Sequence, residues 1–126
     1  MNPLTFLDQC KVNVWSDTYS VIKTKTIPTD FVAIIKDQQE ITAIVSSSQV
    51  VKSSAVETEG NWKILTFDAV LPFELVGFLA AVAQVLAKAQ ISIFALSAYS
   101  TDHILIKENM LEKALQELKK LGCITG

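Results

Sequence analysis

The chain has 126 residues, half of them hydrophobic, and a formal net charge of −2 from 11 basic and 13 acidic residues. This length allows one ordinary domain or two very small ones, and the composition can supply a hydrophobic core without metals or disulfides. The small net charge and the absence of arginine argue against a nucleic acid or an anionic membrane as partner, because the guanidinium fork that grips phosphates and guanine edges is missing.

The two cysteines and the single histidine limit the metal chemistry. Cys10 and Cys123 lie near opposite ends of the chain without a CxxC motif, and together with His103 they fall short of a zinc ligand set. We therefore expect no metal and no other cofactor. We interpret the cysteines as free thiols of a cytoplasmic protein, with a disulfide between the ends as the alternative. The N-terminal residues lack the pattern of a secretion signal, and residues 75–87 are too short to span a bilayer.

The first half of the chain predicts a small, helix-poor unit. Its apolar and β-branched runs predict strands at Tyr19–Thr24, Phe31–Lys36 and Ile41–Ser46. The connection at Lys25–Asp30 is too short for a helix, and Ser47–Lys52 leaves room for one or two helical turns.

The second half predicts a complete alternation of strands and helices. Trp62–Phe67 alternates as a strand does, and residues 76–89 form an apolar helix after a loop that contains Pro72. Residues 91–99 and 102–107 pair most simply as a hairpin.

A second helix and a short last strand complete the chain. Asn109 and Glu112 have the spacing of a capping box, Gly122 ends the helix, and residues 123–125 form the strand. The helix has an apolar stripe of Leu111, Ala114, Leu115, Leu118 and Leu121.

This order of elements predicts an α+β, ferredoxin-like (βαββαβ) fold, with two helices on one face of an antiparallel sheet. Shifting the first half by 62 residues places Phe31–Lys36 on Ile93–Ala98, and Glu40 on Asp102. We interpret this match as a tandem duplication with a degenerate N-terminal copy, in residues 1–60, and a complete copy in residues 61–126.

The helix at residues 76–89 is apolar on several faces, with Gln84 and Lys88 as its polar residues. Such a helix is buried on more than one side, either by the rest of the chain or by another subunit. We expect a homodimer on this ground.

The polar tip of the predicted hairpin, Ser97 to His103, allows two interpretations. Ser, Thr and Asp bond to the backbone wherever a chain reverses, so the tip can be a simple turn. It can also be half of a binding site, with Asp102 as the partner of an ammonium group. A helix start near Gly77 would supply N–H groups for a carboxylate, although Gly77 can equally serve helix packing. His103 falls on the opposite strand face from Asp102 and is more typical of a surface than of a catalyst.

The stretch LPFELVGFLAAVAQVLAKAQISIF, followed by ALSAYSTDHILIKE and an amphipathic helix, resembles the C-terminal half of the CASTOR-type tandem ACT domain proteins. The strand QQEITAIV resembles an acidic and apolar motif of their N-terminal domain. The resemblance extends over roughly residues 19–122. It implies a regulatory fold and not an enzyme, with an amino acid or similar metabolite bound at an interface between ACT domains.

The resemblance also implies the site residues. Gly77, Ser97, Tyr99 and Asp102 match family positions, whereas Ala98, Ser100 and Leu75 depart from them and disfavour arginine as the ligand. In the expected site the N–H groups near the helix start take the carboxylate and Asp102 takes the amine. The expected ligand-binding set is Glu74, Leu75, Val76, Gly77, Phe78, Ser97, Tyr99, Thr101 and Asp102.

Three other functions of this fold class are disfavoured, and one alternative stays open. An acylphosphatase needs an arginine-type anion cradle, and an RNA-binding module needs aromatic residues within basic strands. Cysteine–histidine catalysis would depend on the single histidine. The open alternative is an interaction or oligomerisation module that binds no metabolite.

Overall fold

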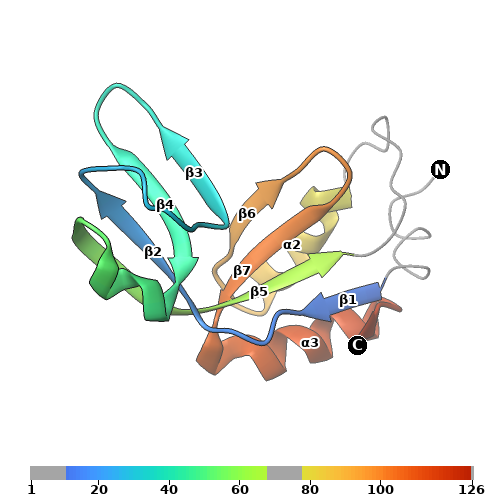
Figure 1. Ribbon diagram of the computed structural model, residues 1–126. Coiled ribbons are helices and arrows are strands. Elements are labelled where there is room, and N and C mark those ends of the chain that lie inside the picture. Colours follow the sequence, from blue (N-terminus) through green and yellow to red (C-terminus); the bar gives the residue numbers. More distant parts are fainter. Residues whose placement is uncertain (1–10, 68–77, 126) are drawn as a thin grey trace. The chain divides into compact units, whose positions relative to one another are not determined.

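The computed structural model describes residues 11–67 and 78–125, which form two compact units (Figure 1). Unit 2 is continuous and comprises Ser16–Trp62. Unit 1 comprises the described residues before and after it, so unit 2 interrupts unit 1 in the sequence. None of the helices in the described ranges has the length and apolarity that a bilayer crossing requires.

Unit 1 has the predicted ferredoxin-like order, with one additional strand. Its strands are β1 (Lys11–Val14), the end of β5 (Ala55–Phe67), β6 (Phe94–Ser97), β7 (Asp102–Lys107) and β8 (Ile124–Thr125), in the sheet order β6-β7-β5-β1-β8. Its helices are α2 (Phe78–Lys88) and α3 (Leu111–Lys120), the latter preceded by the short 3₁₀-helix η2 (Glu108–Met110). The unpredicted strand β1 pairs antiparallel with β5 and parallel with β8, and so separates these two strands.

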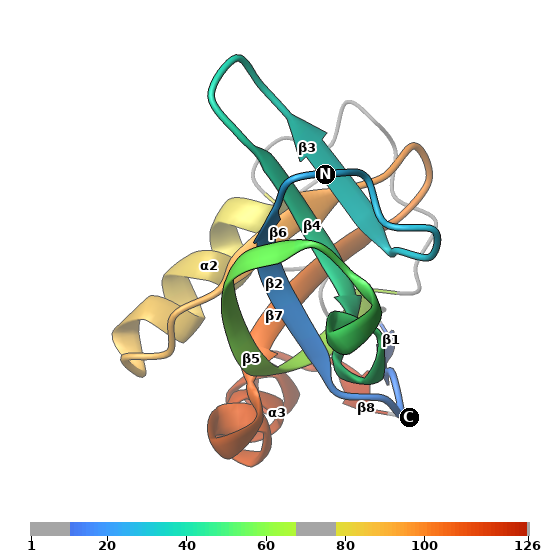
Figure 2. The same ribbon diagram turned by 60° about the vertical axis from the view of Figure 1, so that its left-hand side comes forward.

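The core of unit 1 lies between its sheet and its two helices (Figure 1, Figure 2). The predicted stripe of α3 is confirmed, because Ala114 and Leu118 are fully buried and the leucines beside them pack against the same cluster. The buried members are Val12, Leu65, Phe67, Val82, Leu86, Ile91, Ile104, Ile106, Ala114, Leu118 and Cys123. Each buried Leu or Ile side chain contributes about 1.5–3 kcal/mol relative to an exposed one.

The helix α2 has a solvent-facing side that consists of small and polar residues. Ala80, Gln84, Ala87 and Lys88 are exposed, whereas Val82 and Leu86 are fully buried. The small side chains of the alanines reconcile the apolar composition of this helix with exposure of one face.

Both helices of unit 1 end in a Schellman motif, in which the residue after the C-cap adopts a positive φ. At the end of α3 this residue is Gly122, with φ 100°, and the N–H of Cys123 donates to the carbonyl of Leu118. At the end of α2 it is Gln90, with φ 61°, and the N–H of Ile91 donates to the carbonyl of Leu86. The stop predicted at Gly122 is therefore confirmed.

The predicted capping box at the start of α3 is wrong. Asn109 lies inside η2, and the N-cap of α3 is Met110, which makes no side-chain cap hydrogen bond. Helical turns already begin at Glu108, directly after β7, so Asn109 is within the helical run and not in front of it.

Unit 2 has the same strand arrangement but no α-helix in Ser16–Trp62. Its strands, in the sheet order β3-β4-β2-β5, are β2 (Tyr19–Thr24), β3 (Ala33–Lys36), β4 (Ile41–Ser46) and the first part of β5. The 3₁₀-helix η1 (Ser47–Lys52) follows β4. Its small core consists of Ile22, Ala43 and Val45, with Ile34, Val50 and Ala55 packed against it.

A cluster of hydroxyl groups fixes the loop that joins β2 to β3 in unit 2. The hydroxyl oxygen of Ser54 accepts a hydrogen bond from the N–H of Thr26 at 3.0 Å. It also lies 3.0 Å from the hydroxyl oxygen of Thr24 and 2.8 Å from that of Thr26. Side-chain hydrogen bonds thus fix a segment that has little apolar surface to bury.

The two units share one strand register, with corresponding residues 61 positions apart. Ala33 pairs with Ile44 as Phe94 pairs with Leu105, and both hairpins keep this register to their ends. The residues before η1 and η2, Ser46 and Lys107, have φ/ψ of −57°/138° and −58°/139°. The predicted offset of 62 is thus one residue too large, so Ile41 and not Glu40 corresponds to Asp102.

The interpretation of the cysteines as free thiols is wrong for Cys123, which is disulfide-bonded and buried. The other cysteine of the chain, Cys10, lies outside the described residues.

Candidate functional site

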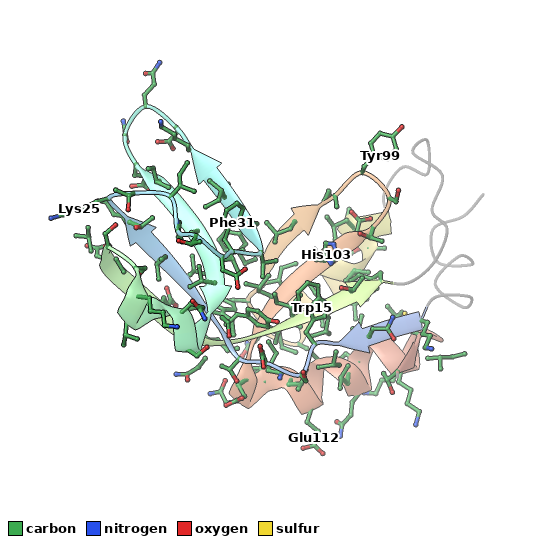
Figure 3. All side chains as sticks on the ribbon, in the orientation of Figure 1. Trp15, Lys25, Phe31, Tyr99, His103 and Glu112 are labelled. Atoms are coloured by element: carbon green, nitrogen blue, oxygen red, sulfur yellow. The ribbon has the colours of Figure 1, made fainter. Side chains whose placement is uncertain are left out.

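The tip of the β6–β7 hairpin brings together the predicted residues Ser97, Tyr99, Thr101 and Asp102. Ser97 and Asp102 are the last paired residues of the two strands, and the N–H of Ala98 donates to the carbonyl of Thr101 at 2.8 Å. Tyr99 lies at the turn and is 84% exposed (Figure 3).

The carboxylate of Asp102 is held across the hairpin by a side chain. The hydroxyl of Ser97 donates to Oδ1 of Asp102 at 2.7 Å. Among the described residues no backbone N–H donates to this carboxylate, so its second oxygen, Oδ2, has hydrogen-bonding capacity left. Asp102 as a whole residue is partly buried, but its hydrogen bond to Ser97 is exposed at the hairpin tip.

The β3–β4 hairpin of unit 2 shows what a simple aspartate turn looks like. There, Oδ1 of Asp37 accepts hydrogen bonds from the N–H groups of Gln39 and Glu40, both at 2.8 Å. These backbone donors lower the pKa of Asp37 below its usual value. Asp102 makes no such backbone bond to the described residues, so the two hairpin tips hold their aspartates in different ways.

Asp102 lies on the sheet face that the helices cover. Side chains alternate along β7, so Asp102 shares a face with Ile104 and Ile106, which belong to the core beneath α2 and α3. The helix α2 ends shortly before β6 begins, and β6 runs toward the hairpin tip. The first residue of α2, Phe78, therefore lies toward the same end of unit 1 as Asp102.

The other part of the predicted site lies outside the described residues. Glu74, Leu75, Val76 and Gly77 fall in the range 68–77, and of Phe78 only the helical backbone is described.

His103 lies on the opposite face of β7, as predicted, and is part of a hydrogen-bonded network. Its Nδ1 lies 2.8 Å from the hydroxyl of Thr66, and its Nε2 lies 3.0 Å from the hydroxyl of Thr101. Nε1 of Trp15 donates to the same Thr66 oxygen at 2.7 Å. The rings of Trp15 and His103 meet edge to face at a centroid distance of 6.1 Å (Figure 3).

Burial lowers the pKa of His103, and the nearby charge of Asp102 opposes this effect in part. The neutral imidazole suits the network, since one ring nitrogen donates and the other accepts. This arrangement fixes the strand end that carries Thr101 and Asp102. The roles of Trp15 and Thr66 could not be predicted from the sequence, because their proximity to His103 depends on the long-range pairing of β1, β5 and β7.

A metal centre is not found in the described part of the chain. Within residues 11–67 and 78–125, no group of three His, Cys, Asp or Glu side chains could hold a metal ion.

Comparisons with known proteins identify one family. The ACT domain family model matches residues 57–120. A structure from Agrobacterium tumefaciens aligns with a TM-score of 0.81 at 21% identity, covering 93% of this chain and 92% of that chain. A protein of unknown function from Vibrio cholerae aligns with a TM-score of 0.76 at 20% identity, covering 92% of each chain.

The regulatory subunit of aspartate kinase from Thermus thermophilus, in a ligand-free form, aligns with a TM-score of 0.64 at 13% identity, covering 87% of this chain and 95% of that chain. At these identities, the structural similarities establish the fold alone. No curated protein sequence matches the chain significantly.

Proposed function

Because the chain belongs to the ACT domain family, we propose that it is a non-catalytic regulatory protein that binds an amino acid or a similar small metabolite at the β6–β7 hairpin tip. The observation that carries this proposal is the hydrogen bonding of the Asp102 carboxylate. This carboxylate is oriented by Ser97 and makes no backbone hydrogen bond to the described residues.

The proposed ligand spans from Asp102 to the start of α2. Asp102 binds its ammonium group through Oδ2, while Ser97 holds Oδ1. The N–H groups around Val76, Gly77 and Phe78 take the carboxylate, because the first N–H groups of a helix lack partners within it. Leu75, Tyr99 and Thr101 line the space between them, and Glu74 lies beside Leu75 in sequence. Arginine is disfavoured as the ligand.

The same proposal includes a tandem arrangement and a homodimer. Unit 2 repeats the strand order and register of unit 1, which supports a CASTOR-type pair of ACT-like copies, the first of them degenerate. We place their boundary near residue 60. A homodimer would provide an interface between ACT domains at which the ligand is enclosed.

The test is a thermal-shift screen with the twenty amino acids and common metabolites, followed by Asp102→Asn. A ligand at one hundred times its dissociation constant should stabilise the protein by about 2.7 kcal/mol. Asp102→Asn should weaken the binding of that ligand by about 1.5–3 kcal/mol, because the substitution removes the negative charge that the ammonium group contacts. Glu112→Gln is the matched control, since Glu112 is an exposed acid on α3 (Figure 3).

A second candidate function is an interaction module that binds no metabolite. It is favoured by the exposed apolar side chains of unit 2, among which Val51 is 88%, Val56 55% and Ile27 53% exposed. If no metabolite raises the melting temperature, or if Asp102→Asn leaves the affinity of a ligand unchanged, this second function replaces the first.

A further inference from the structure

Four side chains connect the sheet of unit 1 to the tip of the β6–β7 hairpin. Nε1 of Trp15 donates to the hydroxyl oxygen of Thr66 at 2.7 Å, and this oxygen lies 2.8 Å from Nδ1 of His103. Nε2 of His103 lies 3.0 Å from the hydroxyl of Thr101, the residue before β7. The four residues are called here the His103 clasp, because the imidazole joins β5 to the end of the hairpin.

The donors and acceptors of the His103 clasp assign the direction of its bonds. The indole N–H of Trp15 only donates, so the Thr66 oxygen accepts there and its own hydrogen is available for an acceptor. Nδ1 of His103, at 2.8 Å, is that acceptor. Nε2 then carries the hydrogen of a neutral imidazole and donates to Thr101. Each indole, hydroxyl and ring hydrogen from Trp15 to His103 is thus directed at an acceptor.

A second ring proton would reverse one of these bonds. The imidazolium form of His103 has two N–H donors and no acceptor. Its Nδ1–H would point at the Thr66 oxygen, and the Thr66 hydroxyl hydrogen would lose the acceptor that it has in the neutral network. Because this contact is partly buried, the loss of that acceptor is unfavourable. The hydrogen bonds of the clasp therefore favour the neutral ring.

The surroundings of His103 favour the neutral ring as well. Its cross-strand neighbour Leu96 and the other clasp residues are uncharged. Burial lowers the pKa of His103, and the negative charge of Asp102 raises it to a smaller extent. The charge of Asp102 thus reduces the preference for the neutral ring without cancelling it.

We propose that the His103 clasp is a proton-sensitive device, which holds the β6–β7 hairpin tip on β5 while the imidazole is neutral and releases the tip when His103 is protonated. Release lets the charged ring reach water and lets the Thr66 hydroxyl find a new acceptor. The opening is local, because Ile104, the next residue of β7, is fully buried in the core. Histidine suits this role, since its ordinary titration lies between pH of about 5 and 8.

Release of the tip would also displace Asp102, which directly follows Thr101. The affinity of the ligand proposed for the Asp102 carboxylate should therefore decrease in acid. This consequence rests on the proposed function, whereas the release itself does not. The device is tested without a ligand, so the absence of a ligand site and the absence of a proton-sensitive tip are separate results.

The hairpin of unit 2 is a matched control without a clasp. The N–H of Ala98 donates to the carbonyl of Thr101 at 2.8 Å, and at the corresponding positions the N–H of Asp37 donates to the carbonyl of Glu40 at 3.1 Å. Unit 2 contains no histidine, because the single histidine of the chain lies in unit 1. Backbone donors lower the pKa of Asp37, so its carboxylate stays charged where histidine titrates.

The test follows both hairpins in the uniformly ¹⁵N-labelled full chain as the pH is lowered from about 8 to about 5. It measures the exchange protection of the amides of Ala98 and Asp37, corrected for the intrinsic pH dependence of exchange. Protection at Ala98 should fall up to about tenfold per pH unit below pH of about 6.5, and level off below the pKa of folded His103. Protection at Asp37 should stay constant. The imidazole nitrogen shifts should show the Nε2–H tautomer at neutral pH.

Two variants test the direction of the bonds. Thr66→Val removes the hydroxyl that donates to the neutral ring, so it should raise the pKa of His103. Thr101→Val removes an acceptor that the imidazolium binds more strongly than the neutral ring, so it should lower this pKa. A purely structural role of the two threonines would not produce shifts of opposite sign. His103→Gln should make the protection at Ala98 independent of pH.

Three outcomes would overturn the inference. The first is constant protection at Ala98 while His103 titrates, which would show that the tip stays closed over a charged ring. The second is an Nδ1–H tautomer at neutral pH. The third is a fall at Ala98 that persists in His103→Gln. If His103→Gln does not fold, Thr66→Val takes its place: it should diminish the fall at Ala98 as the pKa of the ring approaches its ordinary value, and an undiminished fall would overturn the inference.

Discussion

Units 1 and 2 have the same strand arrangement but differ in the helices and loops that pack on their sheets. In unit 1 two α-helices bury a large apolar core, whereas unit 2 has a 3₁₀-helix and a loop over a core of Ile22, Ala43 and Val45. Even so, the hairpin registers and the turn that follows the second strand of each hairpin agree. The same strand pairing can thus carry very different amounts of helix. Because its core is smaller, we expect unit 2 to be less stable than unit 1.

The largest expected difference between the units concerns a pair of corresponding core residues. Ile106→Ala should lower the free energy of unfolding by about 2–5 kcal/mol, because a fully buried side chain leaves a cavity in a dense core. Val45→Ala at the corresponding position should cost only about 1–2 kcal/mol, since fewer methyl groups are lost. Urea denaturation measures both. Equal costs would show that the core of unit 2 is as demanding as that of unit 1.

The next prediction concerns the loop that replaces a helix in unit 2. Ser54→Ala should destabilise unit 2 by about 1 kcal/mol, because Thr24 and Thr26 lose their shared hydroxyl partner. Hydrogen exchange should become faster at Thr26 and remain unchanged in α2. Ser48→Ala is the control, since Ser48 is exposed. Unchanged exchange at Thr26 in Ser54→Ala would mean that apolar packing, and not the hydroxyl cluster, fixes this loop.

A smaller effect of opposite sign is expected at the helix ends of unit 1. Gln90→Gly should stabilise the protein by about 0.5–1 kcal/mol, because a residue with φ 61° is better accommodated as glycine. Gly122→Ala, at the corresponding position after α3, should destabilise it by about 1 kcal/mol. Chemical denaturation of the two variants tests this pair. A Gln90→Gly protein that is less stable than wild type would show that the Gln90 side chain contributes more than its backbone costs.

The smallest effect is the pH dependence that the single histidine contributes to the stability of unit 1. Because folding lowers the pKa of His103, the unfolded chain binds more protons just below its usual pKa of about 6.5. Stability should therefore be complete above pH of about 6.5 and decrease as the pH falls below it. The imidazole resonance of His103 reports the folded pKa directly, and His103→Gln should remove this part of the pH dependence. A folded pKa above the usual value would contradict the burial of the network.

Much of the fold could be predicted from sequence patterns. The alternating and β-branched runs at Tyr19–Thr24, Ile41–Ser46 and Asp102–Lys107 coincide with β2, β4 and β7. The helical patterns locate α2 and α3 to within a few residues. These elements are predictable because each buries one face, and burial imposes a period on the sequence.

Elements that depend on distant backbone pairing could not be predicted. The strand β1 has only two apolar residues, and its pairing with β5 and β8 joins residues far apart in the chain. The polar start of β5 indicated a boundary, because Glu57 and Glu59 are exposed, whereas their backbone pairs with β2. The predicted offset of 62 was wrong for a related reason. It aligned Glu40 with Asp102 because both are acidic, whereas the backbone hydrogen bonds of the two hairpins correspond at an offset of 61.

The candidate site divides in a similar way. Sequence patterns placed Asp102 at a hairpin end and His103 on the other face, since both follow from strand alternation. The bond from Ser97 to Asp102 and the contrast with Asp37 required the hairpin geometry.

The interruption of unit 1 by unit 2 has a consequence for folding during synthesis. All strands of unit 2 lie within residues 16–62, so this unit can form as soon as that segment has left the ribosome. Unit 1 cannot complete its sheet until β8 is made, because β1 sits between β5 and β8. More than one hundred residues are synthesised after β1 before its parallel partner β8 exists, since Lys11 pairs with Ile124. We expect unit 2 to fold first, and the stretch around Lys11 to be the part of the nascent chain most dependent on chaperones.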